Sequence, residues 1–466
     1  MIANQMSPVN ANMALIRSSN LAISDGIMIK PTISFYTLGC RLNQSETAVL
    51  ERSVETDGFQ LVDFEESADV VVINTCTVTA GGDTDTRRLV HKINRLNPRA
   101  RIALIGCQAQ MDKGKLLELP NVHWVIGNAR KMELSSILQS TFEAMEPQVI
   151  TPAITRDSFT ILPQGGTYSA GIGVDHRHRR VNLKIQDGCD FFCSFCVIPY
   201  ARGRARSREF DDILREARGL AAAGHKEIVL TGVNLGTYQY KDRTLMDVVE
   251  ALEQIEELAR IRISSIEPTT IPESLIRKMA GRTKLCRHLH IPLQSGSDAI
   301  LKAMKRKYSA EEFERFIRMA DELVPQICIG TDMIVGFPGE TEEEFQRSAD
   351  RLREWPVDYA HVFSYSRRQM AHSGKLPSSD RIPAEIIERR SQILRDLSLR
   401  KRQMFHGSLL GTRQNVLFEE KKKEEWIGLT DNYARVAVKS DQPLRNEFRT
   451  VRMVTARGAT VGGILK

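Results

Sequence analysis

Three cysteines, Cys189, Cys193 and Cys196, stand close together in the segment QDGCDFFCSFCVIPYARGR, directly after an apolar run that is typical of a strand. Thiolates bind iron and zinc, so this spacing predicts that the three sulfur atoms hold one metal centre. A tetrahedral zinc site needs a fourth Cys or His nearby, whereas an iron–sulfur cube with one open iron needs only three protein ligands. We therefore favour an iron–sulfur cluster, with a zinc site or three buried loop cysteines as the alternatives.

A second set of cysteines, Cys40, Cys76 and Cys107, is spread along the chain, but each member follows an apolar run by one or two residues. The runs predict strands at 33–38, 70–74 and 102–106. The carboxyl ends of parallel strands meet at one edge of a sheet, where ligands bind. We therefore expect a second metal centre with one open position, and three unrelated half-buried thiols are the alternative.

The elements that must position these cysteines form an α/β pattern. Strands alternate with helical stretches over 31–145, which predicts an N-terminal domain with a doubly wound parallel sheet. Residues 146–178 lack periodicity and are interpreted as a linker. Six further strand–helix units over 179–404 predict a central partial (β/α)6 barrel. Short apolar runs over 405–466 predict a small antiparallel β-barrel, and residues 1–30 are interpreted as a flexible extension.

Length and composition agree with this division. The chain has 466 residues, too many for one core, and its 42% hydrophobic and 26% charged content excludes disorder of the whole chain. No apolar run reaches the roughly 18 residues of a membrane span, and the first segment lacks the apolar core of a secretory signal. We therefore expect a cytoplasmic protein without membrane contact, whose thiols stay reduced. The net charge of +7 permits a polyanionic partner without requiring one.

Phe195, between the last two cysteines, makes the first motif resemble the signature of the radical S-adenosylmethionine superfamily. Two three-cysteine centres in this order make the chain resemble the methylthiotransferases of that superfamily from about residue 31 to 466. The shared motifs are TLGCRLNQSE, NTCTVT, IGCQAQ, EIVLTGVNLGTY, SSIEP, HLHIPLQSGSD, MKRKY and TDMIVGFPGETEEEF. The C-terminal domain is similar to the TRAM domain, an RNA-binding β-barrel of these enzymes.

Within that family, TLGC-x-x-N together with TGVNLG most resembles the enzymes that add a methylthio group to C2 of threonylcarbamoyladenosine at position 37 of tRNA. Members that act on isopentenyladenosine or on a ribosomal protein carry other motifs around the first cysteine, and both remain alternative functions. Two departures from the family pattern occur: Phe191 stands where a polar or basic residue is usual, and 366–371 reads SRRQMA in place of an SPRPGT-like stretch.

The resemblance implies a transferase with two [4Fe–4S] clusters, at the two sets of cysteines, and two equivalents of S-adenosyl-L-methionine per turnover. A flavodoxin- or ferredoxin-like system would reduce the cluster at Cys189, Cys193 and Cys196, so that the first equivalent yields a radical able to take hydrogen from C2. The set of Cys40, Cys76 and Cys107 would hold the sulfur. The second equivalent would supply the methyl group, and the sulfur donor is unknown.

Other residues are candidates for contacts with S-adenosyl-L-methionine because they lie at predicted strand ends. They are Gly232, Asn234, Glu267, Gln294 and Asp332. The carboxylates and the amide of Gln294 suit ribose hydroxyls or the amino group, and the resemblance places Phe195 near the adenine. A purely structural polar role is the alternative for each of the polar candidates.

A run of alternating arginines follows the cluster motif, and guanidinium groups there suit the phosphates of tRNA. Its members are Arg202, Arg204, Arg206 and Arg208. A solvated charge run is the alternative. Two hypotheses from other classes of protein also remain open: an iron–sulfur electron carrier, which would need four ligands at each centre, and a non-catalytic RNA-binding protein.

Overall fold

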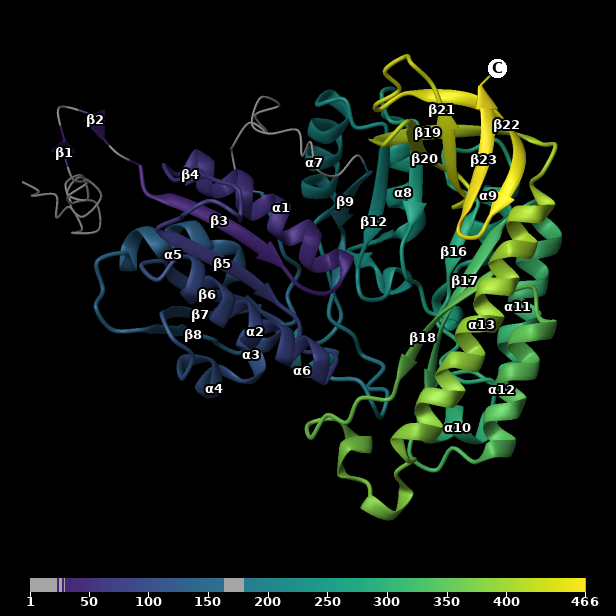
Figure 1. The fold of residues 1–466 in the computed structure, drawn as a ribbon, viewed down its shortest axis with the longest axis horizontal. Coiled ribbons are helices and arrows are strands. Elements are labelled where there is room, and N and C mark those ends of the chain that lie inside the picture. Colours follow the sequence, from purple (N-terminus) through teal and green to yellow (C-terminus); the bar gives the residue numbers. More distant parts are fainter. Residues whose placement is uncertain (1–22, 25–26, 29, 163–179, 466) are drawn as a thin grey trace, which may run out of the picture.

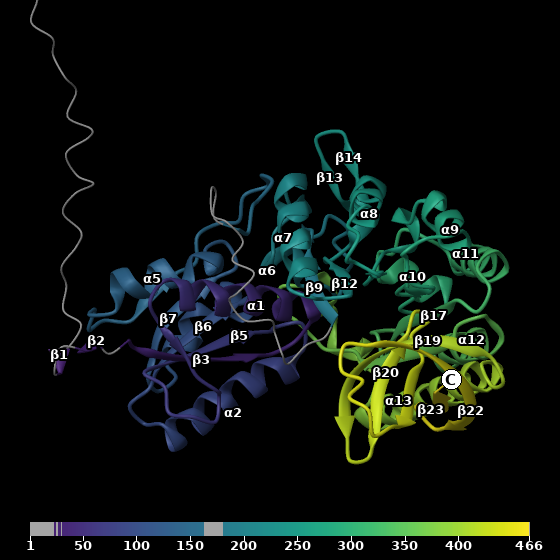
Figure 2. The same ribbon diagram turned by 90° about the horizontal axis from the view of Figure 1, so that it is seen from above.

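The computed structural model of the chain describes residues 23–24, 27–28, 30–162 and 180–465 (Figure 1). Three domains follow one another along the chain: a parallel sheet, a partial barrel and a small closed barrel (Figure 1, Figure 2). Most of the expected extension at 1–30, and 163–178 of the expected linker, lie outside the described residues. No described helix is long and apolar enough to cross a membrane.

The N-terminal domain is built on a parallel sheet with the strand order β4-β3-β5-β6-β7-β8. Its strands are β3 (Thr32–Thr37), β4 (Gln60–Leu61), β5 (Val70–Thr75), β6 (Arg101–Gly106), β7 (Val122–Gly127) and β8 (Gln148–Ile150). Every residue of β5 is buried, as expected for a central strand covered on both faces. The predicted doubly wound sheet is confirmed, and β8 carries it past the boundary predicted at residue 145.

Helices cover both faces of this sheet and enclose two separate apolar layers. Helices α1 (Arg41–Thr56) and α5 (Leu134–Thr141) pack on one face, where Trp124 is buried. Helices α2 (Ala80–Leu96), α3 (Cys107–Met111) and α4 (Lys113–Leu117) cover the other face. The sheet is therefore rigid, and the loops at its carboxyl edge start from fixed points.

The central domain has two three-stranded parallel sheets, β15-β12-β9 and β16-β17-β18. Single bridges between Ile261 and Leu285 and between Ser265 and His290 connect them, so that the six strands form a partial barrel as predicted. The strands are β9 (Arg180–Lys184), β12 (Glu227–Thr231), β15 (Arg260–Ile263), β16 (His288–His290), β17 (Cys328–Val335) and β18 (Tyr359–Ser364).

Amphipathic helices bury their apolar faces against the strands of this partial barrel in one continuous core. They are α7 (Phe210–Ala222), α8 (Leu245–Glu253), α9 (Glu273–Ala280), α10 (Asp298–Ala303), α11 (Ala310–Leu323) and α12 (Glu342–Glu354).

Helix α1 also forms the border between the first two domains. The hydroxyl of Ser45 on α1 donates to the carbonyl oxygen of Asn182 on β9 at 2.9 Å. Arg52, further along the helix, pairs with Glu216 on α7 at 3.1 Å. The helix that begins directly after Cys40 therefore packs on the first strand of the partial barrel.

The C-terminal domain is a closed barrel with the strand order β19-β20-β21-β23-β22. Its strands are β19 (Arg413–Lys422), β20 (Glu425–Thr430), β21 (Arg435–Lys439), β22 (Phe448–Arg457) and β23 (Thr460–Leu465). The sequence predicts an antiparallel barrel, but β21 and β23 pair in parallel. The reason is geometric, because an odd number of strands cannot alternate in direction around a closed ring.

The long helix α13 (Ala384–Ser408) leads into this barrel and continues past the domain boundary predicted at residue 404. Phe405, near its end, lies in the apolar core of the barrel together with Cys328 and Tyr359 from the central domain. The yellow barrel therefore sits directly on the end of the central domain, as both views show (Figure 1, Figure 2).

Candidate functional site

The cysteines of the first motif lie on a loop between β10 (Gln186–Asp187) and the short helix α6 (Ile198–Ala201). Each sulfur accepts a hydrogen bond. The donors are the backbone N–H of Phe191 to Cys189 (3.5 Å), the backbone N–H of Ile198 to Cys196 (3.4 Å) and Nη1 of Arg306 to Cys193 (3.1 Å). Such donors stabilise a thiolate more than a thiol, and thiolates bind iron, so this loop fits an iron–sulfur cluster.

The protonation of these thiols follows from their burial. Burial raises the pKa of Cys189 to about 11 and that of Cys196 to about 12, so both are protonated when no metal is bound. Binding of iron must therefore release protons. Among the described residues, no three His, Cys, Asp or Glu side chains converge on a single metal ion. An iron–sulfur cluster does not need this convergence on one ion, because each thiolate binds a different iron atom.

Arg306 connects the cluster loop to one of the candidate residues. Its guanidinium group donates to Cys193 and also forms an ion pair with Glu267, and its side chain is only 2% exposed. Burial raises the pKa of Glu267, although Arg306 opposes this effect. The sequence analysis did not select Arg306; its signal was the basic MKRKY motif, which contains it.

A cavity of about 240 Å3 opens beside the cluster loop and brings together Phe195, Gln294 and Asp332 with Cys196. These three candidates come from different segments of the central domain. Gln294 adopts a left-handed backbone conformation (φ +70°), which strains any residue other than glycine and marks the segment after β16. The cavity therefore collects half of the candidate contacts to S-adenosyl-L-methionine in one place.

The remaining candidates lie elsewhere. The side-chain oxygen of Asn234 accepts from the hydroxyl of Thr270 at 2.9 Å and from the backbone N–H of Glu267 at 3.3 Å, so Asn234 holds the Glu267 loop in place. Gly232 lines a larger neighbouring cavity, and a side chain there would lie 2.9 Å from Oε1 of Gln186. The oxygen of Asn234 thus has a structural role, and a contact of Asn234 with S-adenosyl-L-methionine stays a prediction.

The second set of cysteines stands at the carboxyl edge of the N-terminal sheet, as expected. Cys40 precedes α1, Cys76 follows β5, and Cys107 is the first residue of α3 after β6. Burial raises the pKa of Cys76 to about 11, and the nearby thiols of Cys107 and Cys40 add to this effect. Asn128 donates from Nδ2 to the sulfur of Cys107 at 3.4 Å. The three thiols therefore form one group with a donor on a sulfur, which fits a second cluster.

Gly39 makes the close approach of two of these cysteines possible. It has φ +91°, and a Cβ at this position would lie 2.7 Å from Cβ and 2.8 Å from Sγ of Cys76. Any side chain here would push the Cys40 loop away from Cys76.

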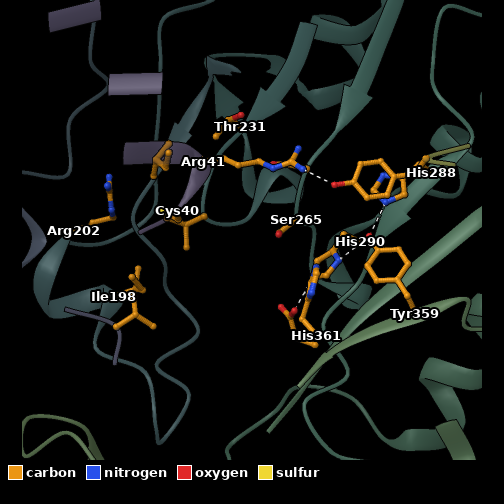
Figure 3. A pocket seen from close by; sticks show the side chains of 17 residues that line it. Cys40, Arg41, Ile198, Arg202, Thr231, Ser265, His288, His290, Tyr359 and His361 are labelled. Carbon is orange, nitrogen blue, oxygen red and sulfur yellow. Dashed lines mark hydrogen bonds and ion pairs between the residues drawn. The ribbon is translucent and has the colours of Figure 1, made fainter. Parts of the chain in front are cut away.

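The larger cavity, of about 360 Å3, has Cys40 of the second set in its wall and is lined by residues of all three domains (Figure 3). Cys40 and Arg202 lie on one side of it, and His290 and His361 lie on the other (Figure 3). Its other polar lining residues include Arg41, Thr231, Ser264, Ser265, His288, Asp332, Tyr359 and Tyr433. This cavity shares Val78 and Asp332 with the smaller one, so the two form adjoining compartments.

A buried charge network lies behind the larger cavity and joins the first two domains. Glu46 of α1 pairs with Lys131 of its own domain and with Lys184 and Arg202 of the central domain. Burial opposes ionisation of Glu46, but the three cations together hold its pKa well below the usual value. Asp187 also pairs with Lys184 and Arg202, at 2.7 Å and 3.0 Å.

This network corrects the assignment of two arginines to RNA. Arg202 is 1% exposed and bound by Glu46 and Asp187. Arg208 is fully buried, and its guanidinium group is bound by Asp212 and Glu216. Both guanidinium groups therefore form ion pairs with buried carboxylates. The alternating spacing of the arginines does not indicate these ion pairs.

The other two arginines of the run are more accessible. Arg206 pairs with Asp187 at 3.2 Å and is 12% exposed, whereas Arg204 is 37% exposed. Arg204 pairs with the exposed Asp190 at 3.2 Å and its guanidinium group lies over the ring of Phe192. Of the four, Arg204 has the placement that best suits an RNA phosphate.

The segment that departs from the family pattern ties the central domain to the Cys76 loop. The hydroxyl of Ser366 accepts from the backbone N–H of Ala80 at 3.0 Å. Arg368 pairs with Asp83 at 2.6 Å and donates to Thr77, the residue after Cys76. Ser366 and Arg368 of the SRRQMA segment therefore connect the central domain to the N-terminal domain.

Two family models match the chain: the Radical SAM superfamily over residues 183–352 and the uncharacterized protein family UPF0004 over residues 32–127. The chain is 39% identical to the threonylcarbamoyladenosine tRNA methylthiotransferase MtaB of Aquifex aeolicus, over 86% of this chain and 95% of that protein. It is 30% identical to the tRNA-2-methylthio-N(6)-dimethylallyladenosine synthase of Dehalococcoides mccartyi, over 91% of this chain and 96% of that protein.

Among solved structures, the chain is similar to the radical S-adenosylmethionine methyltransferase TsrM of Kitasatospora setae. The TM-score is 0.55, and the match covers 74% of this chain and 77% of that one at 18% identity. At this level of sequence identity, the similarity indicates a shared fold alone.

Proposed function

This chain belongs to the tRNA methylthiotransferases of the radical S-adenosylmethionine superfamily, and from that membership we propose that it adds a methylthio group to C2 of threonylcarbamoyladenosine at position 37 of tRNA. One observation carries the proposal. Cys40 of the second set lines the larger cavity and Cys196 of the first set lines the smaller one, and the two cavities share Val78 and Asp332. A base bound between them would face both centres.

As a radical S-adenosylmethionine enzyme, the chain uses a [4Fe–4S] cluster, S-adenosyl-L-methionine and a reductant. We propose two clusters and two equivalents of S-adenosyl-L-methionine per turnover. When bound, these groups supply the radical that removes hydrogen from C2, the sulfur that replaces it and the methyl group.

At the first centre, the protein would hold the cluster and orient S-adenosyl-L-methionine. Cys189, Cys193 and Cys196 would bind the cluster, and Arg306 would fix Cys193 while it keeps the carboxylate of Glu267 in place. Phe195, Gln294 and Asp332 line the compartment next to these thiols, where the adenosine part of S-adenosyl-L-methionine would lie. A ring and two polar side chains suit a nucleoside, because the ring can stack on the base and the ribose hydroxyls can donate hydrogen bonds to the carboxylate and to the amide oxygen.

At the second centre, Cys40, Cys76 and Cys107 would bind the other cluster at the wall of the larger cavity. The buried network around Glu46 would fix the distance between the two centres, because it joins helix α1 to the strand and loop that carry the first motif. The three domains around the cavity would keep water from a reactive radical.

The tRNA would approach over the exposed Arg204, two residues after the cavity-lining Arg202, and over the C-terminal barrel, whose Tyr433 lines the larger cavity. We further propose that a flavodoxin- or ferredoxin-like protein supplies the electrons, and that the reaction takes place in the cytoplasm, where tRNA is found.

Nucleoside analysis of tRNA by mass spectrometry tests this function directly. We expect 2-methylthio-threonylcarbamoyladenosine to disappear when the gene is removed and to return when the gene is supplied. A gene with Cys189→Ala or Cys40→Ala should not restore it, whereas Cys286→Ala should, because Cys286 is a buried free cysteine outside both sets. If the methylthiolated form of dimethylallyladenosine is lost instead, the enzyme acts on that base and the proposed substrate is wrong.

A further inference from the structure

Arg41 occupies an unusual position in the larger cavity. It is the first residue of α1, directly after Cys40, and its side chain extends across the cavity (Figure 3). Its Nη2 donates to the hydroxyl of Tyr433 from the C-terminal barrel at 2.8 Å. Within the described part of the chain, Arg41 forms no ion pair with a carboxylate. The guanidinium group therefore keeps most of its donors free.

The other charged groups of the cavity have hydrogen-bond or ion-pair partners of their own. Arg202 is bound by Glu46 and Asp187, and Asp332 accepts from Nε2 of His290 at 3.0 Å. Burial holds the pKa of His288 well below its usual value, so this ring is neutral near pH 7. An arginine side chain is charged at every physiological pH. Arg41 thus brings to the cavity a positive charge that no carboxylate of the described residues contacts.

Tyr433 fixes the position of that charge. Its ring stacks on His288 with a centroid distance of 4.1 Å and an interplanar angle of 22°. The guanidinium group of Arg262 lies over the same ring at 5.3 Å. Because His288 and Arg262 pack against its ring, the hydroxyl of Tyr433 has a fixed position. The hydrogen bond from Arg41 to this hydroxyl then fixes the guanidinium group of Arg41.

We propose that Arg41, oriented by Tyr433, binds the carboxylate of the threonylcarbamoyl group and so selects this substrate. The inference rests on the proposed function, because threonylcarbamoyladenosine carries a carboxylate on its N6 substituent and dimethylallyladenosine carries only an apolar group there. N6 is attached to C6 of the six-membered ring of adenine, and only the ring atom N1 lies between C6 and C2. A base whose C2 faces the centre at Cys40 therefore brings its N6 substituent within reach of the next residue.

The test compares two substrates that differ only in this charge. The holoenzyme acts on an anticodon stem-loop RNA that carries threonylcarbamoyladenosine, or on the same RNA with the carboxylate converted to a carboxamide. The measured quantity is the ratio of the two kcat/KM values. We expect Arg41→Gln to lower this ratio about 10- to 100-fold, the effect of one hydrogen bond to a charged group. Tyr433→Phe should lower it less, because the charge remains but its position is no longer fixed.

Controls separate recognition from damage to the site. Arg88→Gln removes a guanidinium group that is 78% exposed on the same domain and should leave the ratio unchanged. Iron content must match the unaltered enzyme, because Arg41 is next to Cys40. An equal loss on both RNAs in Arg41→Gln, with iron retained, would overturn the inference alone. Failure of the unaltered enzyme to methylthiolate the carboxylate RNA would overturn the proposed function as well.

Discussion

Nζ of Lys184 lies 2.6 Å from Oε1 of Glu46, and this contact joins the first strand of the partial barrel to helix α1 of the N-terminal domain. Both side chains are almost completely buried, at 4% and 0% exposure. Because α1 starts next to Cys40 and β9 leads to Cys189, the pair lies between the two sets of cysteines. The position of one set of cysteines relative to the other therefore depends on a charge contact inside the protein.

We expect Glu46→Gln to destabilise the protein strongly. Removal of this carboxylate leaves Lys131, Lys184 and Arg202 buried with only Asp187 to compensate them, and loss of one partner from a buried ionic group costs about 3 to 5 kcal/mol. Denaturation with urea measures the difference in the free energy of unfolding. The matched change Glu146→Gln on an exposed residue should alter it by less than about 0.5 kcal/mol. Similar stability of the two variants would contradict the role given to the network.

Gly39→Ala should remove the second centre and spare the first. The added Cβ would lie 2.7 Å from Cys76, so the Cys40 loop must move. Iron per chain should fall towards that of one cluster, with reductive cleavage of S-adenosyl-L-methionine retained and methylthiolation lost. Gly58→Ala is the matched control, because Gly58 has φ +97° and no atom within 4 Å of the added Cβ. Equal iron loss in both variants would point to backbone strain and not to contact with Cys76.

Arg306→Lys should impair the first centre although the charge is kept. Lysine cannot reach Cys193, Glu267 and the hydroxyl of Tyr308 together, as the guanidinium group does. Changes around metal ligands commonly cost about 10- to 100-fold in affinity or activity, and we expect a loss of that size in 5′-deoxyadenosine formation. Arg88→Lys on the surface serves as the comparison. Unchanged cleavage with full iron content would show that Arg306 has no part in the centre.

Asp358 should make stability depend on pH. Burial raises the pKa of this carboxyl to about 7, against about 4 in the unfolded chain. The folded state therefore binds the proton more tightly, so the stabilisation is complete below about pH 4 and is lost as the pH rises through 7. Asp358→Asn cannot take up that proton, so its stability relative to the unaltered protein should improve between pH 5 and 8. Urea denaturation at several pH values checks this, with the exposed Asp242→Asn as a flat reference.

Much of this architecture follows from the sequence, because it depends on local patterns. Apolar runs of strand length predicted the parallel sheet and the six strands of the partial barrel, and both are confirmed. The position of Cys40, Cys76 and Cys107 after successive strands predicted that they meet at one sheet edge. The resemblance to the methylthiotransferases is confirmed by relatives that match nearly the whole chain.

The rest depends on contacts between distant residues, which spacing does not reveal. Arg41 and Tyr433 are separated by 392 positions, and although Arg41 lies in the TLGCRLNQSE motif, nothing in the sequence pairs it with Tyr433. Arg202 stands in a regular basic run, yet its partner Glu46 is 156 positions away on α1, and this contact holds Arg202 in the interior. A charged side chain is buried only where the fold brings an oppositely charged partner beside it, and the spacing of residues in the sequence does not identify that partner.

The apolar core that the C-terminal barrel shares with Cys328 and Tyr359 has a consequence for truncation. In a chain that ends before Arg413, these residues would be exposed to solvent, and the central domain would have an exposed apolar patch prone to aggregation. Such a fragment should aggregate before its affinity for RNA can be measured. The barrel thus covers apolar residues of the central domain, and we expect the protein without it to be insoluble.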